Sequence, residues 1–216
     1  MRIVIFGAGT GLSRSVANLF GEKGFSVLLV ARNEEKLQNE TKLLQDKGIS
    51  AAYRVADVSD GQEMSGVLAE IKQPEALPDV ILFNAFANMG GGFADETWDN
   101  LKKELDVNVG GAFHILKEML PLYQEAGKGN LFFTGGGFGI TPVPDYLGVS
   151  IGKAALRNMV QAAATQTKGT GVHVAIVTIM GFIGGEAPKY APDRIAEEYW
   201  KLYNQEAGSF ETEIIY

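Results

Sequence analysis

Short apolar runs alternate with amphipathic segments along most of the chain. The strongest runs are Arg2–Phe6, Ser26–Ala31, Val80–Phe83, Asn130–Thr134 and Val172–Ile179, with a weaker one at Ala51–Val55. Within each run the apolar residues are nearly continuous and rich in β-branched and aromatic side chains. This pattern is typical of strands that are covered on both faces.

The segments between these runs carry apolar residues at helical spacing, as in Leu12, Val16, Leu19 and Phe20. Residues three or four positions apart lie on one face of a helix. Strand and helix patterns therefore alternate from residue 2 to about residue 180. This alternation predicts an α/β fold with a single Rossmann-type, doubly wound parallel sheet in a three-layer αβα arrangement.

The last part of the chain is less regular. Pro188 and Pro192 precede an expected helix at Arg194–Tyr203, and Ile214–Ile215 is expected to form a final edge strand. No repeat, low-complexity tract or linker divides the sequence. We therefore expect residues 1–216 to form one domain.

Composition narrows the functional classes. The 216 residues carry a formal net charge of -7, which argues against a nucleic-acid partner because such a surface needs a basic field. There is no cysteine, and His114 and His173 stand far apart, so we expect no metal site. No apolar stretch approaches the roughly 20 residues of a membrane span, and the first run is too short for a signal peptide. We expect a cytoplasmic protein with no membrane partner.

A glycine-rich turn follows the first expected strand. The segment Phe-Gly-Ala-Gly-Thr-Gly-Leu-Ser leads from that strand into the first expected helix. Glycine lets the backbone approach a ligand closely, and the free N–H groups of a helix start favour a pyrophosphate. We predict a phosphate-binding turn rather than one that only packs. Its residues are Gly7, Gly9, Thr10, Gly11, Leu12 and Ser13.

The end of the second expected strand favours one dinucleotide over another. An NAD site usually places an acid there to hold the ribose 2′-hydroxyl. This chain instead reads Val-Ala-Arg-Asn, with Arg32 and no acid before Glu34. The arginine fork suits a 2′-phosphate. We therefore predict NADP(H) as the preferred cofactor and NAD(H) as the alternative, against the simpler interpretation of Arg32 as a solvated residue at a strand end.

With the glycine turn and several later motifs, the chain resembles the short-chain dehydrogenase/reductase family over roughly residues 1–185. The later positions are Asp57-Val58, Asn84-Ala85, Asn108 and Lys153, in the family's order, and Ser13 replaces the last glycine of the turn. The resemblance implies that Asp57 and Val58 lie near the adenine ring. It also implies that Asn84 and Ala85 border the cofactor while tying the central sheet together, and that Lys153 binds the ribose.

The same resemblance implies partners. Family members act on small-molecule substrates, and a small segment at about residues 182–210 would lie on the substrate side. Members commonly assemble through their long helices, so a homodimer or homotetramer is implied.

Asn108 resembles the family's active-site asparagine on its long fourth helix. It stands in Leu-Asp-Val-Asn-Val-Gly-Gly, and two glycines inside a helix cost about 1 kcal/mol each relative to alanine. Gly110 and Gly111 therefore predict a distortion or a close contact, in line with the bulge that the family has there. The alternative is an ordinary asparagine near a helix break.

Two positions depart from the family pattern. The tyrosine that stands four residues before the lysine is Val149 here, and the serine about thirteen residues before that tyrosine is Gly136. In the family the tyrosine donates a proton to the substrate carbonyl, the serine polarises that carbonyl, and the lysine lowers the tyrosine pKa. We expect the cofactor half of the site to be kept and the half that handles the substrate oxygen to be missing.

Tyr146 is the nearest replacement for the proton donor. On a helix that already includes it, Tyr146 would share a stripe with Val149 and Lys153. It would lie about 4.5 Å nearer the helix start, and helical side chains tilt in that direction, away from Lys153. The alternative is that Tyr146 lines the substrate pocket. Thr134 and Ser150 are weaker candidates.

Two functions follow from this pattern. The first is an NADP(H)-dependent oxidoreductase with an atypical active site, in which a water held by Asn108 and Lys153, or Tyr146 itself, supplies the proton. A small carbonyl, enone or quinone-like substrate suits such a site. The second is a catalytically impaired NADP(H)-binding sensor or regulatory protein. The retained Lys153 favours the enzyme, and the missing tyrosine and serine favour the sensor.

Overall fold

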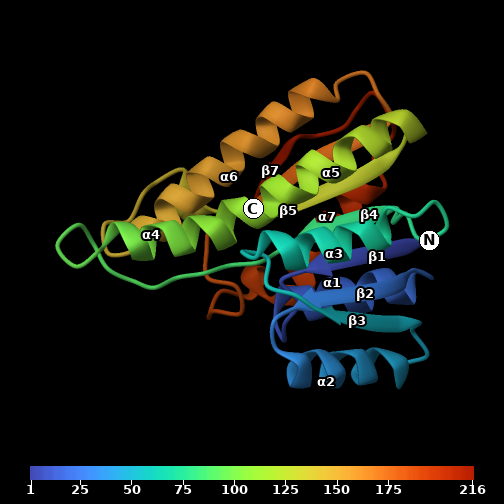
Figure 1. Cartoon of the computed structure of the whole chain (residues 1–216), viewed down its shortest axis with the longest axis horizontal. Coiled ribbons are helices and arrows are strands. Elements are labelled where there is room, and N and C mark those ends of the chain that lie inside the picture. The colour runs from blue at the N-terminus through green and yellow to red at the C-terminus, as the bar shows by residue number, and fades with distance from the viewer.

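A computed structural model describes all 216 residues, and its centre is one seven-stranded parallel sheet (Figure 1). The strand order is β3-β2-β1-β4-β5-β6-β7. The strands are β1 Arg2–Phe6, β2 Ser26–Ala31, β3 Ala51–Val55, β4 Val80–Phe83, β5 Gly129–Gly136, β6 Val172–Ile179 and β7 Glu213–Ile215. The predicted doubly wound parallel sheet is confirmed.

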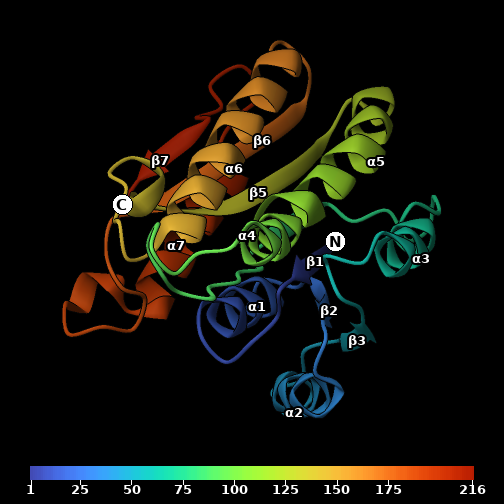
Figure 2. The ribbon, with the colours of Figure 1, turned by 60° about the vertical axis from the view of Figure 1, so that its left-hand side comes forward.

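Helices cover both faces of this sheet (Figure 2). They are α1 Leu12–Glu22, α2 Glu34–Gln45, α3 Gly61–Ile71, α4 Trp98–Leu105, α5 Gly111–Ala126, α6 Leu147–Gln166 and α7 Pro192–Tyr203. The apolar faces of α3, α5 and α6 pack on one side of the sheet, and those of α1, α2 and α7 on the other. None of the helices combines the length and apolarity needed to cross a bilayer.

Strand residues alternate between the two cores. In β1, Ile3 and Ile5 pack among α1, α2 and α7, while Val4 and Phe6 pack on the opposite face. Successive side chains of a strand point to opposite faces, so both kinds must be apolar when both faces are covered. The weaker run, β3, lies at the sheet edge and is mostly exposed, which explains its more polar composition.

The distortion expected at Gly110 and Gly111 is confirmed. A single π-helical turn, Asp106–Gly110, separates α4 from α5. At Gly111 a Cβ atom would lie 2.9 Å from Phe83 and from Val58, so the helix approaches the sheet too closely for a side chain. An extra residue in the helical turn accommodates this contact.

The C-terminal elements follow the prediction with small shifts. The helix α7 begins at Pro192, two residues earlier than expected, because proline is well tolerated in the first turn of a helix. The strand β7 begins at Glu213 and pairs with β6. The strand β5 runs on to Gly136 because its last residues keep pairing with β6.

An aromatic cluster joins α7 to the first half of the chain. The fully buried Phe20 of α1 makes edge-on contacts with Phe25, Trp200 and Tyr203, at ring-centroid distances of 5.2, 5.2 and 5.8 Å. Edge-to-face aromatic pairs stabilise a protein beyond the area that they bury. The last helix is thereby attached to the same core as the first.

We predict that Phe20→Ala lowers the free energy of unfolding by about 3–5 kcal/mol, because it leaves a cavity between α1 and α7. Urea denaturation followed by circular dichroism measures the change. The exposed Leu43 on α2 is the control, and Leu43→Ala should change stability by no more than about 0.5 kcal/mol. If the chain is one domain, Phe20→Ala shifts a single transition, whereas two separated transitions would contradict that organisation.

Candidate active site

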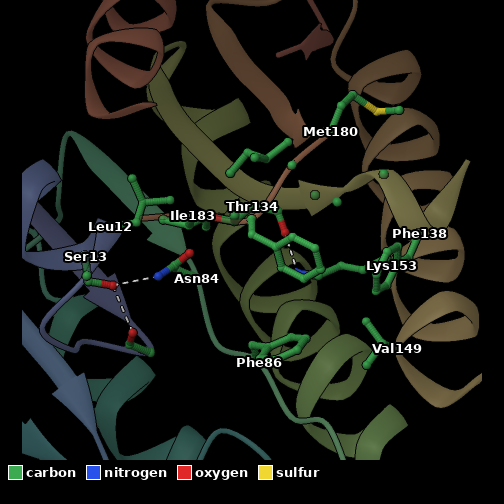
Figure 3. Close-up of a pocket in the computed structure, with 18 of the residues that line it drawn as sticks. Leu12, Ser13, Asn84, Phe86, Thr134, Phe138, Val149, Lys153, Met180 and Ile183 are labelled. Atoms are coloured by element: carbon green, nitrogen blue, oxygen red, sulfur yellow. Dashed lines mark hydrogen bonds between the residues drawn. The ribbon is translucent and has the colours of Figure 1, made fainter. Parts of the chain in front are cut away.

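A cleft of about 500 Å³ opens where β1, β4, β5 and β6 end (Figure 3). Ligands of doubly wound folds bind outside the carboxyl ends of the strands, so this is the expected position for a site. The residues that line the cleft are Gly7, Gly9, Gly11, Leu12, Ser13, Asn84, Phe86, Thr134, Gly135, Gly136, Gly137, Phe138, Val149, Lys153, Ile179, Met180, Gly181, Phe182 and Ile183.

The glycine turn is shaped by a close backbone approach. Gly7 has a φ of 80°, and a Cβ atom there would lie 2.3 Å from the backbone nitrogen of Ala85. Gly9 and Gly11 line the cleft, and a Cβ atom on either would meet nothing within 4 Å. Gly11 precedes α1, and no side chain caps that end. The first N–H groups of α1 are therefore free to bind an anion.

Ser13 connects the turn to the next strand of the sheet. Its hydroxyl donates to the carbonyl of Gly7 at 2.9 Å and accepts from Nδ2 of Asn84 at 2.8 Å (Figure 3). Ser13 is buried, so these two bonds satisfy a hydroxyl that would otherwise be unfavourable there. The replacement of the last glycine therefore adds a hydrogen-bonded link.

Arg32 and Asp57 lie together after the ends of β2 and β3. Nη1 of Arg32 is 3.5 Å from Oδ2 of Asp57, and the arginine side chain is 67% exposed. Burial by itself would raise the pKa of Asp57, but hydrogen bonds from Ser59 and the charge of Arg32 outweigh it and lower that pKa. Arg32 is thus held loosely and remains accessible to another anion.

Three other predicted binding residues lie outside the cleft wall. Val58 is buried against Gly111, and Ala85 is buried against Gly7. Both support the backbone around the site. Thr10 is exposed at the tip of the glycine turn.

Lys153, on α6, forms part of the cleft wall. Its side chain is almost fully buried, and Nζ donates to the carbonyl oxygen of Thr134 at 2.8 Å. Nζ also lies 5.6 Å from the centre of the Phe86 ring. Burial lowers the pKa of Lys153 to about 8, because the apolar surroundings disfavour the charged form.

The two positions that depart from the family pattern both border Lys153. Val149 lies one turn earlier on α6, is 3% exposed and lines the cleft. A Cβ atom on Gly136 would lie 3.7 Å from Cγ of Lys153. The structure therefore places an apolar side chain and a bare backbone beside Lys153, at the two positions where the resemblance led us to expect hydroxyl groups.

Asn108 and Tyr146, two of the predicted catalytic residues, are absent from the cleft wall. The amide of Asn108 is paired with the backbone of Ala87, donating to its oxygen at 2.9 Å and accepting from its nitrogen at 2.8 Å. Tyr146 precedes α6, with its ring 5.3 Å from that of Phe138. The structure thus brings Lys153 alone of the three into the cleft.

The hydroxyl groups of Thr134 and Ser150 have other partners. Oγ1 of Thr134 is hydrogen-bonded to the hydroxyl of Tyr199 at 2.8 Å, inside the core beneath α7. Oγ of Ser150 bonds to the backbone of Val143 and Tyr146. Neither offers a free proton donor to the cleft.

Large apolar side chains form the rest of the wall, and sequence reasoning missed most of them. Phe86, Phe138, Met180, Phe182 and Ile183 all line the cleft. Each lies shortly after the carboxyl end of a strand, and this position in the sequence could have indicated that its side chain lines the cleft. Lys153 is the only residue with an ionisable side chain among those that line the cleft.

Several known proteins are similar to this chain in sequence. Oxidoreductase asL5 of Sarocladium schorii is 25% identical over 203 residues, covering 94% of this chain and 79% of that protein. An uncharacterized oxidoreductase of Staphylococcus aureus (strain MW2) is 26% identical over 175 residues, covering 81% of this chain and 75% of that protein.

Solved structures share the fold. A metagenomic short-chain oxidoreductase in complex with NADP superimposes with a TM-score of 0.90 at 24% identity, covering 100% of this chain and 96% of that one. An actinorhodin polyketide ketoreductase variant with NADPH gives 0.89 at 22% identity, covering 98% and 93%. The sequence model described as short chain dehydrogenase matches residues 1–187. This chain therefore belongs to the short-chain dehydrogenase family of oxidoreductases.

Proposed function

We propose that the protein is an NADP(H)-dependent oxidoreductase that reduces a small, uncharged carbonyl, enone or quinone-like substrate. The observation that carries this proposal is the composition of the cleft. An open glycine turn lies on one side of it, one buried lysine lies on the other, and apolar walls complete it.

A nicotinamide dinucleotide fits the groups that are present. The turn leaves open space beside Gly9 and Gly11, into which an added Cβ would project, and the uncapped start of α1 favours phosphate oxygens. Arg32 is exposed and would hold a 2′-phosphate, with Asp57 next to it toward the adenosine. Lys153 would hold the ribose of the nicotinamide half. When bound, the reduced cofactor supplies the hydride.

The walls favour a substrate without charge. Phe86 and Phe138 lie on the Lys153 side of the cleft (Figure 3), and Phe182 and Ile183 also line it. A carboxylate or phosphate on the substrate would lose its hydration there and find one ammonium group as its partner. An apolar body with one polar carbonyl oxygen matches this surface, since the oxygen alone needs a hydrogen bond.

A second candidate function is an NADP(H)-binding sensor or regulator. Val149 and Gly136 favour it, because they remove the hydroxyl groups that would handle a substrate oxygen. Turnover separates the two functions. An enzyme oxidises NADPH in the presence of at least one compound from a panel of carbonyls, enones and quinones, and the loss of NADPH is followed by absorbance. A sensor binds NADPH but oxidises it with no compound of the panel.

The expected cytoplasmic location stays a prediction.

We predict that NADPH stabilises the chain. A ligand that binds only the folded state adds about 2.7 kcal/mol to the free energy of unfolding at 100 times its dissociation constant. Thermal melting with and without NADPH and NADH measures this effect. A melting temperature that neither nucleotide changes would remove both candidate functions.

We predict that Arg32→Ala weakens NADPH binding by about 10- to 100-fold, because a hydrogen-bonded charge pair contributes roughly 1.5–3 kcal/mol. NADH affinity should change much less. Titration of intrinsic fluorescence gives both dissociation constants. The matched control is Arg54→Ala on β3, where the arginine pairs with Glu70, and it should leave the ratio of the two affinities unchanged. Equal losses for both nucleotides in Arg32→Ala would contradict the assignment.

We also propose a homodimer or homotetramer held through α4, α5 and α6. These helices leave Trp98, Phe113 and Ile151 exposed, and apolar side chains on long helices favour association. Light scattering should give a mass of two or four times 23.2 kDa. A single-chain mass at micromolar concentration would contradict this proposal.

A further inference from the structure

The cleft holds a single candidate for proton transfer. Val149 and Gly136 occupy the positions of the family's tyrosine and serine, and Tyr146 lies outside the wall. The amide of Asn108 is bonded to the backbone of Ala87, and Asn108 does not line the cleft. What remains is Lys153, which lines the cleft and carries an amine.

The hydrogen bonds of that amine leave protons free. An ammonium group has three N–H donors and no acceptor. One of them is directed to the carbonyl of Thr134, and no other protein acceptor is bonded to Nζ. The Phe86 ring, 5.6 Å away, attracts the charge without taking a proton. Two N–H groups are therefore available to ligands, one for a ribose hydroxyl and one for a substrate oxygen.

We propose that Lys153 is itself the catalytic proton donor for reduction of the substrate carbonyl. This inference rests on the proposed function. As the carbonyl carbon receives the hydride supplied by the cofactor, its oxygen takes the proton of the Lys153 ammonium. The products are an alcohol, the oxidised cofactor and a neutral amine. The amine then recovers its proton from solvent, so that two electrons and two hydrogens have been added to the carbonyl.

Val149 makes this direct transfer possible. A tyrosine at that position would stand on the same stripe of α6, one turn before Lys153, and would lie between the amine and the substrate. Valine is shorter and carries no polar atom, so the substrate oxygen can approach the amine. Gly136 opens the same space from the strand side, because a side chain there would lie beside the lysine stem.

The surroundings of Lys153 set its acidity through burial. Charged or titratable groups contact α6 at other places: Glu104 of α4 lies against the first turn, and Glu213 of β7 pairs with Arg157. Tyr199 of α7 is bonded to the hydroxyl of Thr134, whereas Lys153 donates to the carbonyl oxygen of that residue. None of these groups pairs with Lys153, and desolvation alone brings its pKa to about 8.

This pKa has a definite consequence for pH dependence. Reduction requires the ammonium form, which predominates below about pH 8 and decreases tenfold for each unit above it. The rate of reduction should therefore be level below about pH 8 and fall above it. A general acid works best when its pKa is near the working pH, and an exposed lysine would be too weak an acid.

The protonation of Lys153 can be tested without turnover. The intact wild-type chain is treated briefly with formaldehyde and cyanoborohydride between pH 6 and pH 11, and the methylation of each lysine is measured by mass spectrometry. The exposed Lys168, which follows α6, is the internal control. We expect the midpoint of Lys153 near pH 8, and saturating NADPH should protect Lys153 and not Lys168. A midpoint that coincides with that of Lys168 would overturn the proposal.

Variants then test the catalytic role, with NADPH and benzil as the carbonyl probe. Lys153→Arg keeps a positive charge and hydrogen-bond donors, but a guanidinium does not release its proton in this range. We expect NADPH affinity within about tenfold of wild type in this variant and a kcat lowered by about 100-fold or more. Lys153→Met should lose as much kcat, and its residual activity should no longer fall above pH 8. Lys168→Met is the matched control and should retain the wild-type profile.

The two proposals fail in different ways. If the wild type binds NADPH and reduces benzil, and Lys153→Arg reduces it as fast, Lys153 only positions the cofactor and the proton-donor role is overturned. If the wild type binds neither nucleotide, the proposed function itself is overturned. If NADPH binds and benzil and the wider panel are not reduced, the sensor is favoured and Lys153 has no catalytic role.

Discussion

The cleft depends on one close contact between two backbones at the centre of the sheet. Gly7, at the end of β1, meets Ala85, just beyond the end of β4, at a distance that excludes a side chain. Hydrogen bonds from Ser13 and Asn84 close the same junction. The start of α1 is thereby fixed above the gap between the two strands, and its free N–H groups face the space where β4, β5 and β6 end. The proposed anion site and the proposed reaction site therefore both depend on this junction.

The second constraint is the burial of a single ammonium group. Transferring a lysine amine into apolar surroundings is unfavourable, and one carbonyl oxygen offsets only part of that cost. Strongly perturbed groups that sit in a cleft concentrate at functional sites. Lys153 meets both conditions, and it is the only buried charged side chain that lines the cleft.

Around this lysine the polar groups are few, and most of them are bonded elsewhere in the chain. Asn108 is engaged with Ala87, and this pairing holds the segment after β4 against the π-helical turn. Where hydroxyl groups would serve a substrate oxygen, there are a valine and a glycine. Large apolar side chains form much of the wall. This composition supports the proposals of a neutral substrate and of Lys153 as the proton donor.

The sheet, its helices and the position of the glycine turn could all be predicted from local sequence. Continuous apolar runs and helical spacing are local properties of the chain, and a parallel sheet with covered faces is their direct consequence. The helix distortion was predictable too, because two adjacent glycines weaken a helix at that point and leave room for a close contact. The partners of the polar groups, in contrast, were set by long-range contacts. Asn108 pairs with a residue 21 positions away and Ser13 with one 71 positions away. Tyr146 precedes α6 and packs its ring near Phe138, outside the wall. Such pairings depend on where distant segments meet in space, and no periodicity along the chain encodes that.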